Sequence, residues 1–210
     1  MNHDLLTRLP YLIAAFLPAL TFHEWAHAVV AYRFGDTTAL RQGRLTLNPF
    51  AHLDPMGTIA IMLVGFGWAR PVPIDARNFR HPWAEFWVAA AGPLMNFTLA
   101  IVFAILFRAG ASSWLGPNKV EVVSTILFIS IQLNLALAFF NLIPIGPLDG
   151  NHLLAKLLPH GASLKFSQWN AQYGSLVLFG AILIEMVLHI GILTILVGVP
   201  VQFVERLLLS

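Results

Sequence analysis

Four long apolar runs limit what this chain can fold into. Each exceeds the ~20 residues that an α-helix needs to cross a bilayer, and backbone groups in hydrocarbon must be satisfied within the segment, which favours helices. The last run is too long for one straight span, so either a bent helix or a tight pair divided near Gly191, Gly198 or Pro200 fits it. The runs cover about residues 10–34, 83–108, 121–143 and 174–209.

Composition supports the same interpretation. Of the 210 residues, 58% are hydrophobic and 10% are charged, whereas an ordinary soluble domain is about one quarter charged. Too few charged side chains are present to cover a water-facing globule. We therefore expect an all-α polytopic membrane protein, with one domain over residues 1–210 and a bundle of about four to six transmembrane helices.

Charge placement gives the expected orientation. Arginines gather at the end of the first run and in the segment between it and the run 83–108, at positions 33, 41, 44, 70, 77 and 80, and basic loops usually stay on the cytoplasmic side. We expect a multi-pass protein of a cell membrane, the prokaryotic cytoplasmic membrane in particular. No basic-aromatic pattern indicates a nucleic-acid partner, and no feature specifies an oligomeric state.

The connection between the runs 10–34 and 83–108 is more irregular. "RLTLN" alternates polar and apolar residues like a short strand, and the prolines of "ARPVPID" suit an edge strand. We expect residues 43–48 and 69–75 to form a small membrane-associated β-sheet. The twelve apolar residues 57–68 are short for a span and suit a re-entrant segment.

The first run contains "HEWAH", an H-E-x-x-H pattern of His23, Glu24 and His27. On a helix, residues i and i+4 lie on one face, so both imidazoles can bind one Zn²⁺ while Glu24 takes a proton from the metal-bound water. Ionisable residues inside a span are rare and functional by default. Interhelical hydrogen bonds without a metal are the alternative explanation.

A catalytic zinc takes a third protein ligand, and the absence of cysteine leaves histidine and carboxylate as ligand types. Asp149 is the expected third ligand. It lies in "NLIPIGPLDG" (141–150), where prolines end the run 121–143, and irregular backbone at membrane depth is tolerated where it lines a cavity or is buried in protein. Capping the helix that follows is the other role open to Asp149.

These motifs resemble those of the site-2 protease family (M50) of intramembrane zinc metalloproteases. "HEWAH", "NLIPIGPLDG", "NPFAHLDPMG", "WARPVP" and "AGPLMNF" are all similar to family blocks, and together they run from about residue 20 to 155. The resemblance implies a minimal form without PDZ or CBS domains. Such an enzyme cleaves transmembrane segments of membrane-protein substrates near the cytoplasmic face, so a substrate helix and the lipid bilayer are the implied partners.

The resemblance also implies a role for each site residue. His23, His27 and Asp149 would bind one Zn²⁺ per chain, Glu24 would be the catalytic base, and Asn141 would assist with the oxyanion. Two other functions can use the same histidines: a membrane protein that binds or transports a metal, and an inactive scaffold.

Other polar residues in or beside the apolar runs have two explanations each. Glu185 and His189, spaced i and i+4, are either a second metal half-site or gate, or a hydrogen-bonded pair. His52 and His152 either support the site or belong to a turn and an interfacial helix. Asn96, Gln132 and Asn134 are expected to bond between helices, although Asn96 is also well placed to face the site.

Overall fold

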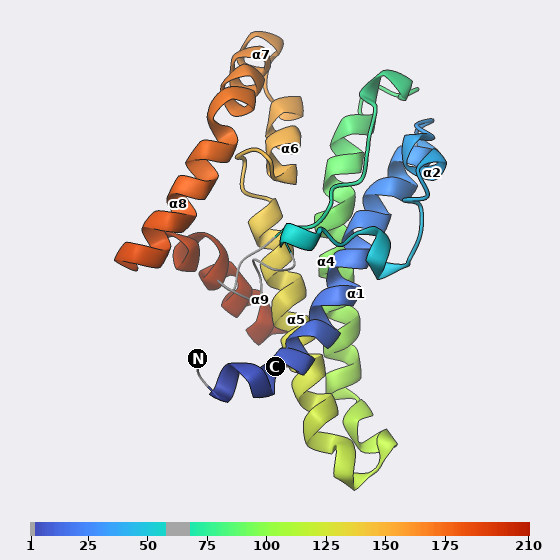
Figure 1. Cartoon of the computed structure of the whole chain (residues 1–210), viewed down its shortest axis with the longest axis vertical. Helices are drawn as coiled ribbons and strands as arrows, with labels where there is room; N and C mark the ends of the chain where they lie inside the picture. The colour runs from blue at the N-terminus through green and yellow to red at the C-terminus, as the bar shows by residue number, and fades with distance from the viewer. Residues whose placement is uncertain (1–2, 58–67) are drawn as a thin grey trace.

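The computed structural model describes residues 3–57 and 68–210, and almost all of its regular structure is helical (Figure 1). The predicted re-entrant segment 57–68 therefore lies outside the described residues, apart from its two ends. The main elements are α1 (His3–Arg33), α2 (Thr38–Arg41), α4 (Ala84–Arg108), α5 (Val120–Asn141), α6 (Asp149–Leu157), α7 (His160–Trp169), α8 (Ser175–Leu188) and α9 (Val199–Leu209).

Four of the described helices are long and apolar enough to cross a membrane, which agrees with the lower end of the expected range. They are Leu9–Arg33, Ala84–Arg108, Val120–Asn141 and the continuous helical segment His160–Leu188. The predicted membrane-protein class is thereby confirmed, with the last span starting well before residue 174 because the polar stretch that precedes it is also helical.

The bundle is built on α1, α4 and α5, which pack side by side (Figure 1). Small residues line the contacts, including Ala19 on α1 and Ala100 on α4, both fully buried. Small side chains let helix backbones approach closely where no hydrophobic driving force acts between helices. Beyond them, Ile131 and Leu135 of α5 form a core with Val201 of α9.

The final apolar run is divided at residues 189–191. His189 and Gly191 have φ angles of 50° and 83°, the left-handed region that ends a helix and favours glycine. The Glu185 carboxylate accepts hydrogen bonds from the N–H groups of Gly191 and Ile192, so it covers the start of the next helical segment. The run is thus two helices, and Glu185 binds backbone rather than the His189 ring.

The predicted β-sheet is wrong. Among the described residues, 43–48 form turn and coil, and 69–75 are extended with one isolated bridge, between Leu53 and Ala69. Pro71 and Pro73 lack the N–H that a ladder needs. The Val72 N–H bonds to the Glu24 carboxylate at 3.0 Å instead, so side chains hold this segment where strand partners were expected.

Asp36, just after α1, anchors the far end of the extended segment. Its fully buried carboxylate accepts hydrogen bonds from Thr38, from the Asp75 N–H at 2.8 Å and from the Asn78 amide at 2.9 Å. Burial acts to raise the pKa of this carboxyl, but the hydrogen bonds outweigh it and hold the pKa below its usual range.

The lowered pKa of Asp36 predicts that acid releases the extended segment. A carboxyl with a depressed folded-state pKa adds stability that is complete above its unfolded value, about 4, and is lost as the pH falls through the folded value. Hydrogen exchange over residues 69–80, corrected for intrinsic rates, should therefore accelerate below about pH 4. Asp36→Asn should show roughly tenfold faster exchange at neutral pH, since hydrogen bonds to charged groups contribute about 1.5–3 kcal/mol.

Asp75→Asn is the matched control. It removes the exposed ion pair with Arg77 but keeps the backbone N–H that Asp36 binds. Equal protection in the Asp36→Asn protein and the wild type at pH 7 would contradict the anchoring role.

Candidate metal centre

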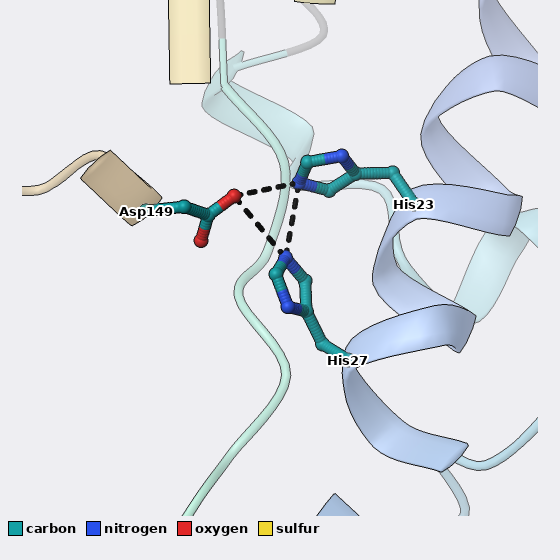
Figure 2. Close-up of side chains that lie close together, drawn as sticks. All are labelled: His23, His27 and Asp149. Carbon is teal, nitrogen blue, oxygen red and sulfur yellow. Dashed lines mark hydrogen bonds and ion pairs between the residues drawn. The ribbon is translucent and has the colours of Figure 1, made fainter. Parts of the chain in front are cut away.

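His23 and His27 lie one turn apart on α1 and face the inside of the bundle (Figure 2). Each is only 6% exposed, and their Nε2 atoms are 3.1 Å apart. The i, i+4 spacing of the two histidines places both imidazoles on one helix face, as the sequence predicts. Two ring nitrogens at this separation are suited to sharing one ion.

Asp149, the first residue of α6, completes the group. Its Oδ2 atom lies 3.3 Å from His23 Nε2 and 3.4 Å from His27 Nε2, and one ligand atom from each residue lies within 4.8 Å of the others. Oδ2 is buried and has no hydrogen-bond partner among the residues that the structure describes. The carboxylate makes no capping bond to α6, so the capping role is not seen.

The backbone around Asp149 is tightly packed. A Cβ atom added at Gly150 would lie 2.3 Å from the Leu142 carbonyl oxygen. The start of α6 therefore rests directly on the end of α5, and only glycine permits this approach. In the "DG" pair, Asp149 thus supplies the carboxylate and Gly150 permits the close packing that places it.

The donor set fits zinc. Two imidazole nitrogens and one carboxylate oxygen form a ligand set of catalytic zinc sites, which leave a fourth position open. The partnerless, buried Oδ2 is the feature that a bound cation would satisfy, because a buried carboxylate is unfavourable unless it is paired or coordinates a metal.

The remaining ring nitrogens fix the imidazole tautomers. His27 Nδ1 lies 2.7 Å from the Val88 carbonyl oxygen, and His23 Nδ1 lies 2.6 Å from Asn96 Oδ1. A carbonyl oxygen can only accept, so each Nδ1–H donates and each Nε2 keeps its lone pair for a metal. Neither acceptor is a charged group.

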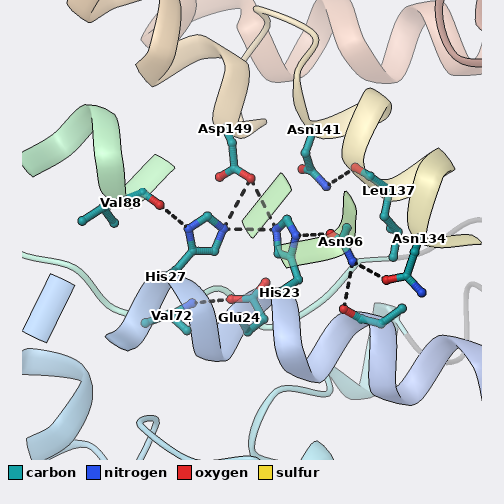
Figure 3. A network of polar contacts seen from close by, with 11 residues as sticks. His23, Glu24, His27, Val72, Val88, Asn96, Asn134, Leu137, Asn141 and Asp149 are labelled. Carbon is teal, nitrogen blue, oxygen red and sulfur yellow. Dashed lines mark hydrogen bonds and ion pairs between the residues drawn. The ribbon is translucent and has the colours of Figure 1, made fainter. Parts of the chain in front are cut away.

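Asn96 also joins three helices (Figure 3). From α4, its Nδ2 donates to the Ala19 carbonyl of α1 at 3.2 Å and to Asn134 Oδ1 of α5 at 2.9 Å. These two bonds orient the amide so that its oxygen faces His23. Asn96 thus both bonds between helices and faces the site, the two roles expected for it. The interhelical roles of Asn134 and Gln132 are also confirmed, since Gln132 bonds Glu205 of α9.

Glu24 lies beside the metal-ligand group and is 8% exposed. Its Oε2 accepts the Val72 N–H, which ties the carboxylate to the extended segment (Figure 3). Glu24, His23, His27 and Asp149 line one cavity of about 490 Å³. The cavity's apolar walls come from α1, α5 and α8: Phe16, Leu20, Leu137, Phe140, Leu178 and Phe179.

Asn141, the last residue of α5, lines the same cavity. Its Nδ2 donates to the Leu137 carbonyl oxygen, 3.0 Å away in the preceding turn. A side-chain amide carries two N–H groups, so one remains after this bond. The structure brings Asn141 to the cavity of the metal-ligand group, and an oxyanion role stays a prediction.

His52 and His152, the two other histidines that the sequence suggests near the site, lie outside the ligand group. His52 is fully buried, but its Nε2 pairs with the Thr46 carbonyl oxygen at 2.8 Å, so it holds the loop. His152 lines the cavity and pairs with Glu85 at 3.1 Å. The hydrogen bond that the His152 ring donates to the Glu85 carboxylate raises the pKa of His152, although burial acts against protonation.

Three residues of the site could not be recognised from their side-chain type: Val72, Val88 and Gly92. Val72 and Val88 act through backbone N–H and C=O groups. Gly92 of α4 contributes the absence of a side chain, since a Cβ there would lie 2.3 Å from His27 Nε2 and 2.7 Å from His23 Nε2.

The geometry is that of a group that could hold one metal ion inside a bundle of membrane-length helices, and comparison with known proteins gives the family. The profile described as Peptidase family M50 matches residues 11–117 and 116–184. The chain belongs to peptidase family M50. With four membrane-length helices, it is a multi-pass membrane protein.

Several relatives carry corresponding names. A Bacillus subtilis (strain 168) protein named "Putative zinc metalloprotease YwhC" is 47% identical over 82% of this chain and 80% of its own length. Proteins named "Putative zinc metalloprotease Rip2", from Mycolicibacterium smegmatis and Mycobacterium tuberculosis, are 34% and 31% identical. They align with 66% and 70% of this chain, which spans 53% and 56% of their lengths. No solved structure gives a significant match.

Gly92→Ala is expected to abolish metal binding. The added methyl would occupy the space between the two Nε2 atoms and push the imidazoles apart, so we expect less than 0.1 Zn²⁺ per chain by elemental analysis. Gly180→Ala, on α8, is the matched control, because a Cβ there meets nothing within 4 Å. Full zinc content in a folded Gly92→Ala protein would contradict the site.

Asn96→Leu is expected to weaken zinc binding by about 10–100-fold, the usual effect of removing a partner that orients a metal ligand. Competition with a chromophoric chelator measures it. Gln132→Leu, which removes an interhelical bond remote from the ligands, should leave zinc affinity unchanged. Equal losses in both variants would show that Asn96 acts through helix packing alone.

Proposed function

We propose that this member of peptidase family M50 is a zinc-dependent intramembrane endopeptidase that cleaves membrane-spanning segments of other proteins near the cytoplasmic face. The observation that carries the proposal is the His23–His27–Asp149 group with Glu24 in one cavity, inside a bundle of membrane-length helices. The family match and the names of the relatives support it.

His23, His27 and Asp149 would hold the Zn²⁺. When bound, zinc supplies a Lewis acid that polarises the scissile carbonyl and makes a water molecule acidic near neutral pH. Glu24 takes the proton of the attacking water and delivers it to the departing amine nitrogen, which is general acid–base catalysis by one carboxylate. The Val72 N–H holds Oε2, which leaves Oε1 for the proton.

Asn141 is proposed to stabilise the negative charge that develops on the carbonyl oxygen. Its second amide N–H is available for that oxygen, since the first is given to Leu137. A preorganised donor in a water-poor site contributes more than the same donor in water, typically about 10²–10³ in rate.

The depth of the site supports cleavage close to one membrane face. His27 precedes the end of α1 by six residues, which is about 9 Å along the axis at 1.5 Å per residue. Arg41 and Arg44 follow in the loop, and basic loops favour the cytoplasm. We place the enzyme in the prokaryotic cytoplasmic membrane, since the relatives named above are bacterial.

The cavity walls support an apolar substrate. Aromatic and leucine side chains from α1, α5 and α8 surround the approach to Glu24 and the ligands. A substrate segment must lose helical hydrogen bonds to offer a peptide bond to this group, because an intact helix shields its carbonyls. The substrate class is therefore an apolar segment that unwinds locally.

Glu24→Gln separates this function from metal storage or transport. The amide keeps an oxygen for the Val72 N–H but cannot take a proton, so we expect unchanged zinc content and at least a 10³-fold loss of cleavage. The protein in vesicles, with a single-span substrate carrying a fluorophore and quencher, provides the assay. Glu121→Gln, at the exposed start of α5, should cleave normally. Unimpaired cleavage by Glu24→Gln would favour another mechanism.

A further inference from the structure

One backbone hydrogen bond of the loop that delivers Asp149 leaves the loop. Between α5 and α6, the N–H groups of Ile143, Ile145 and Leu148 bond within the loop or to the last turn of α5. The N–H of Gly146 instead leaves the loop and donates to Asn170 Oδ1, 24 residues later, at 2.8 Å in a buried position. This bond ties the Asp149 loop to the last membrane-length helical segment.

Asn170 occupies a special position in that segment. It begins a π-helical turn, Asn170–Gly174, between α7 and α8, and is 5% exposed. π-helical turns are rare and occur frequently at functional sites. Packing of apolar helix faces does not by itself require a π-helical turn here. The turn does place the Asn170 amide oxygen against the backbone N–H of Gly146.

The backbones of the two segments are in direct contact at the same point. A Cβ atom at Gly174 would lie 2.7 Å from Asn170 Oδ1 and 3.0 Å from the Gly146 carbonyl oxygen. Glycine at position 174 therefore lets the helix and the loop approach closely enough for the hydrogen bond. Beside it, Leu148 packs with Leu178 and Ile182 of α8.

The Asn170 side chain is committed to the Asp149 loop. Among the described residues its buried Nδ2 has no hydrogen-bond partner, and its Oδ1 accepts the Gly146 N–H. The hydrogen bond of this side chain therefore goes to the loop that carries Asp149.

We propose that Asn170 is a positioning residue for the metal centre: its bond to Gly146, three residues before Asp149, sets where the third ligand lies relative to the two histidines. The last membrane-length segment then supports metal coordination without supplying a ligand. This inference rests on the metal centre of the proposed function.

The test is Asn170→Leu against Asn170→Asp in the full-length protein. Leucine removes the acceptor and aspartate restores one. We expect Asn170→Leu to fold, since Leu178 and Ile182 still pack, but to bind Zn²⁺ about 10–100-fold more weakly. Its Co²⁺-substituted form should also show altered d–d absorption, which reports ligand geometry and not helix packing. Asn170→Asp should give a wild-type spectrum.

Gln172→Leu is the matched control, because Gln172 lies in the same π-helical turn but is exposed. If Asn170→Leu does not fold, Gly174→Ala applies the same test by pushing the amide oxygen away from Gly146. A wild-type Co²⁺ spectrum and zinc affinity in a folded Asn170→Leu or Gly174→Ala protein overturn this inference alone. A wild-type protein that binds no zinc overturns the proposed function together with it.

Discussion

The structure depends on bringing one carboxylate to two imidazoles inside an apolar bundle. Polar groups taken out of water are unfavourable unless they find partners, and the acceptor atoms of His23, His27 and Asp149 converge to 3.1–3.4 Å, where one cation would satisfy all three. Most irregular features near them serve this approach. Gly92 and Gly150 remove side chains where backbone and ring must come close, and the break between α5 and α6 turns Asp149 back toward α1.

Outside the ligands, the supporting contacts are neutral amides. Asn96 binds His23 and reaches Asn134 and the Ala19 carbonyl, so one ring orientation is shared by three spans. In a medium of low effective dielectric such hydrogen bonds are electrostatically stronger than in water, and a partly satisfied network is costly. A change in any of the three spans therefore reaches the metal ligands through direct bonds.

Much of this could be predicted from the sequence, for definite physical reasons. Run length identifies spans, i,i+4 spacing fixes the two histidines on one face, and the prolines after Asn141 mark where Asp149 can leave the helix. The sheet was predicted wrongly because Asp36 and Glu24, distant in sequence, take the hydrogen bonds that a partner strand would have used. Backbone partners such as the Val88 carbonyl have no residue-type signature and need coordinates.

The Val72 N–H links the proposed proton acceptor to the water-facing part of the chain. Glu24 lies within α1, but the group that holds its carboxylate belongs to an extended segment whose position is set by Asp36 beyond the end of that helix. The position of the Glu24 carboxylate therefore depends on the connection that follows α1, outside the helix that carries Glu24. A change in that connection would move the Glu24 carboxylate without touching His23, His27 or Asp149, so the group proposed to carry the proton and the groups that would hold the metal are anchored separately.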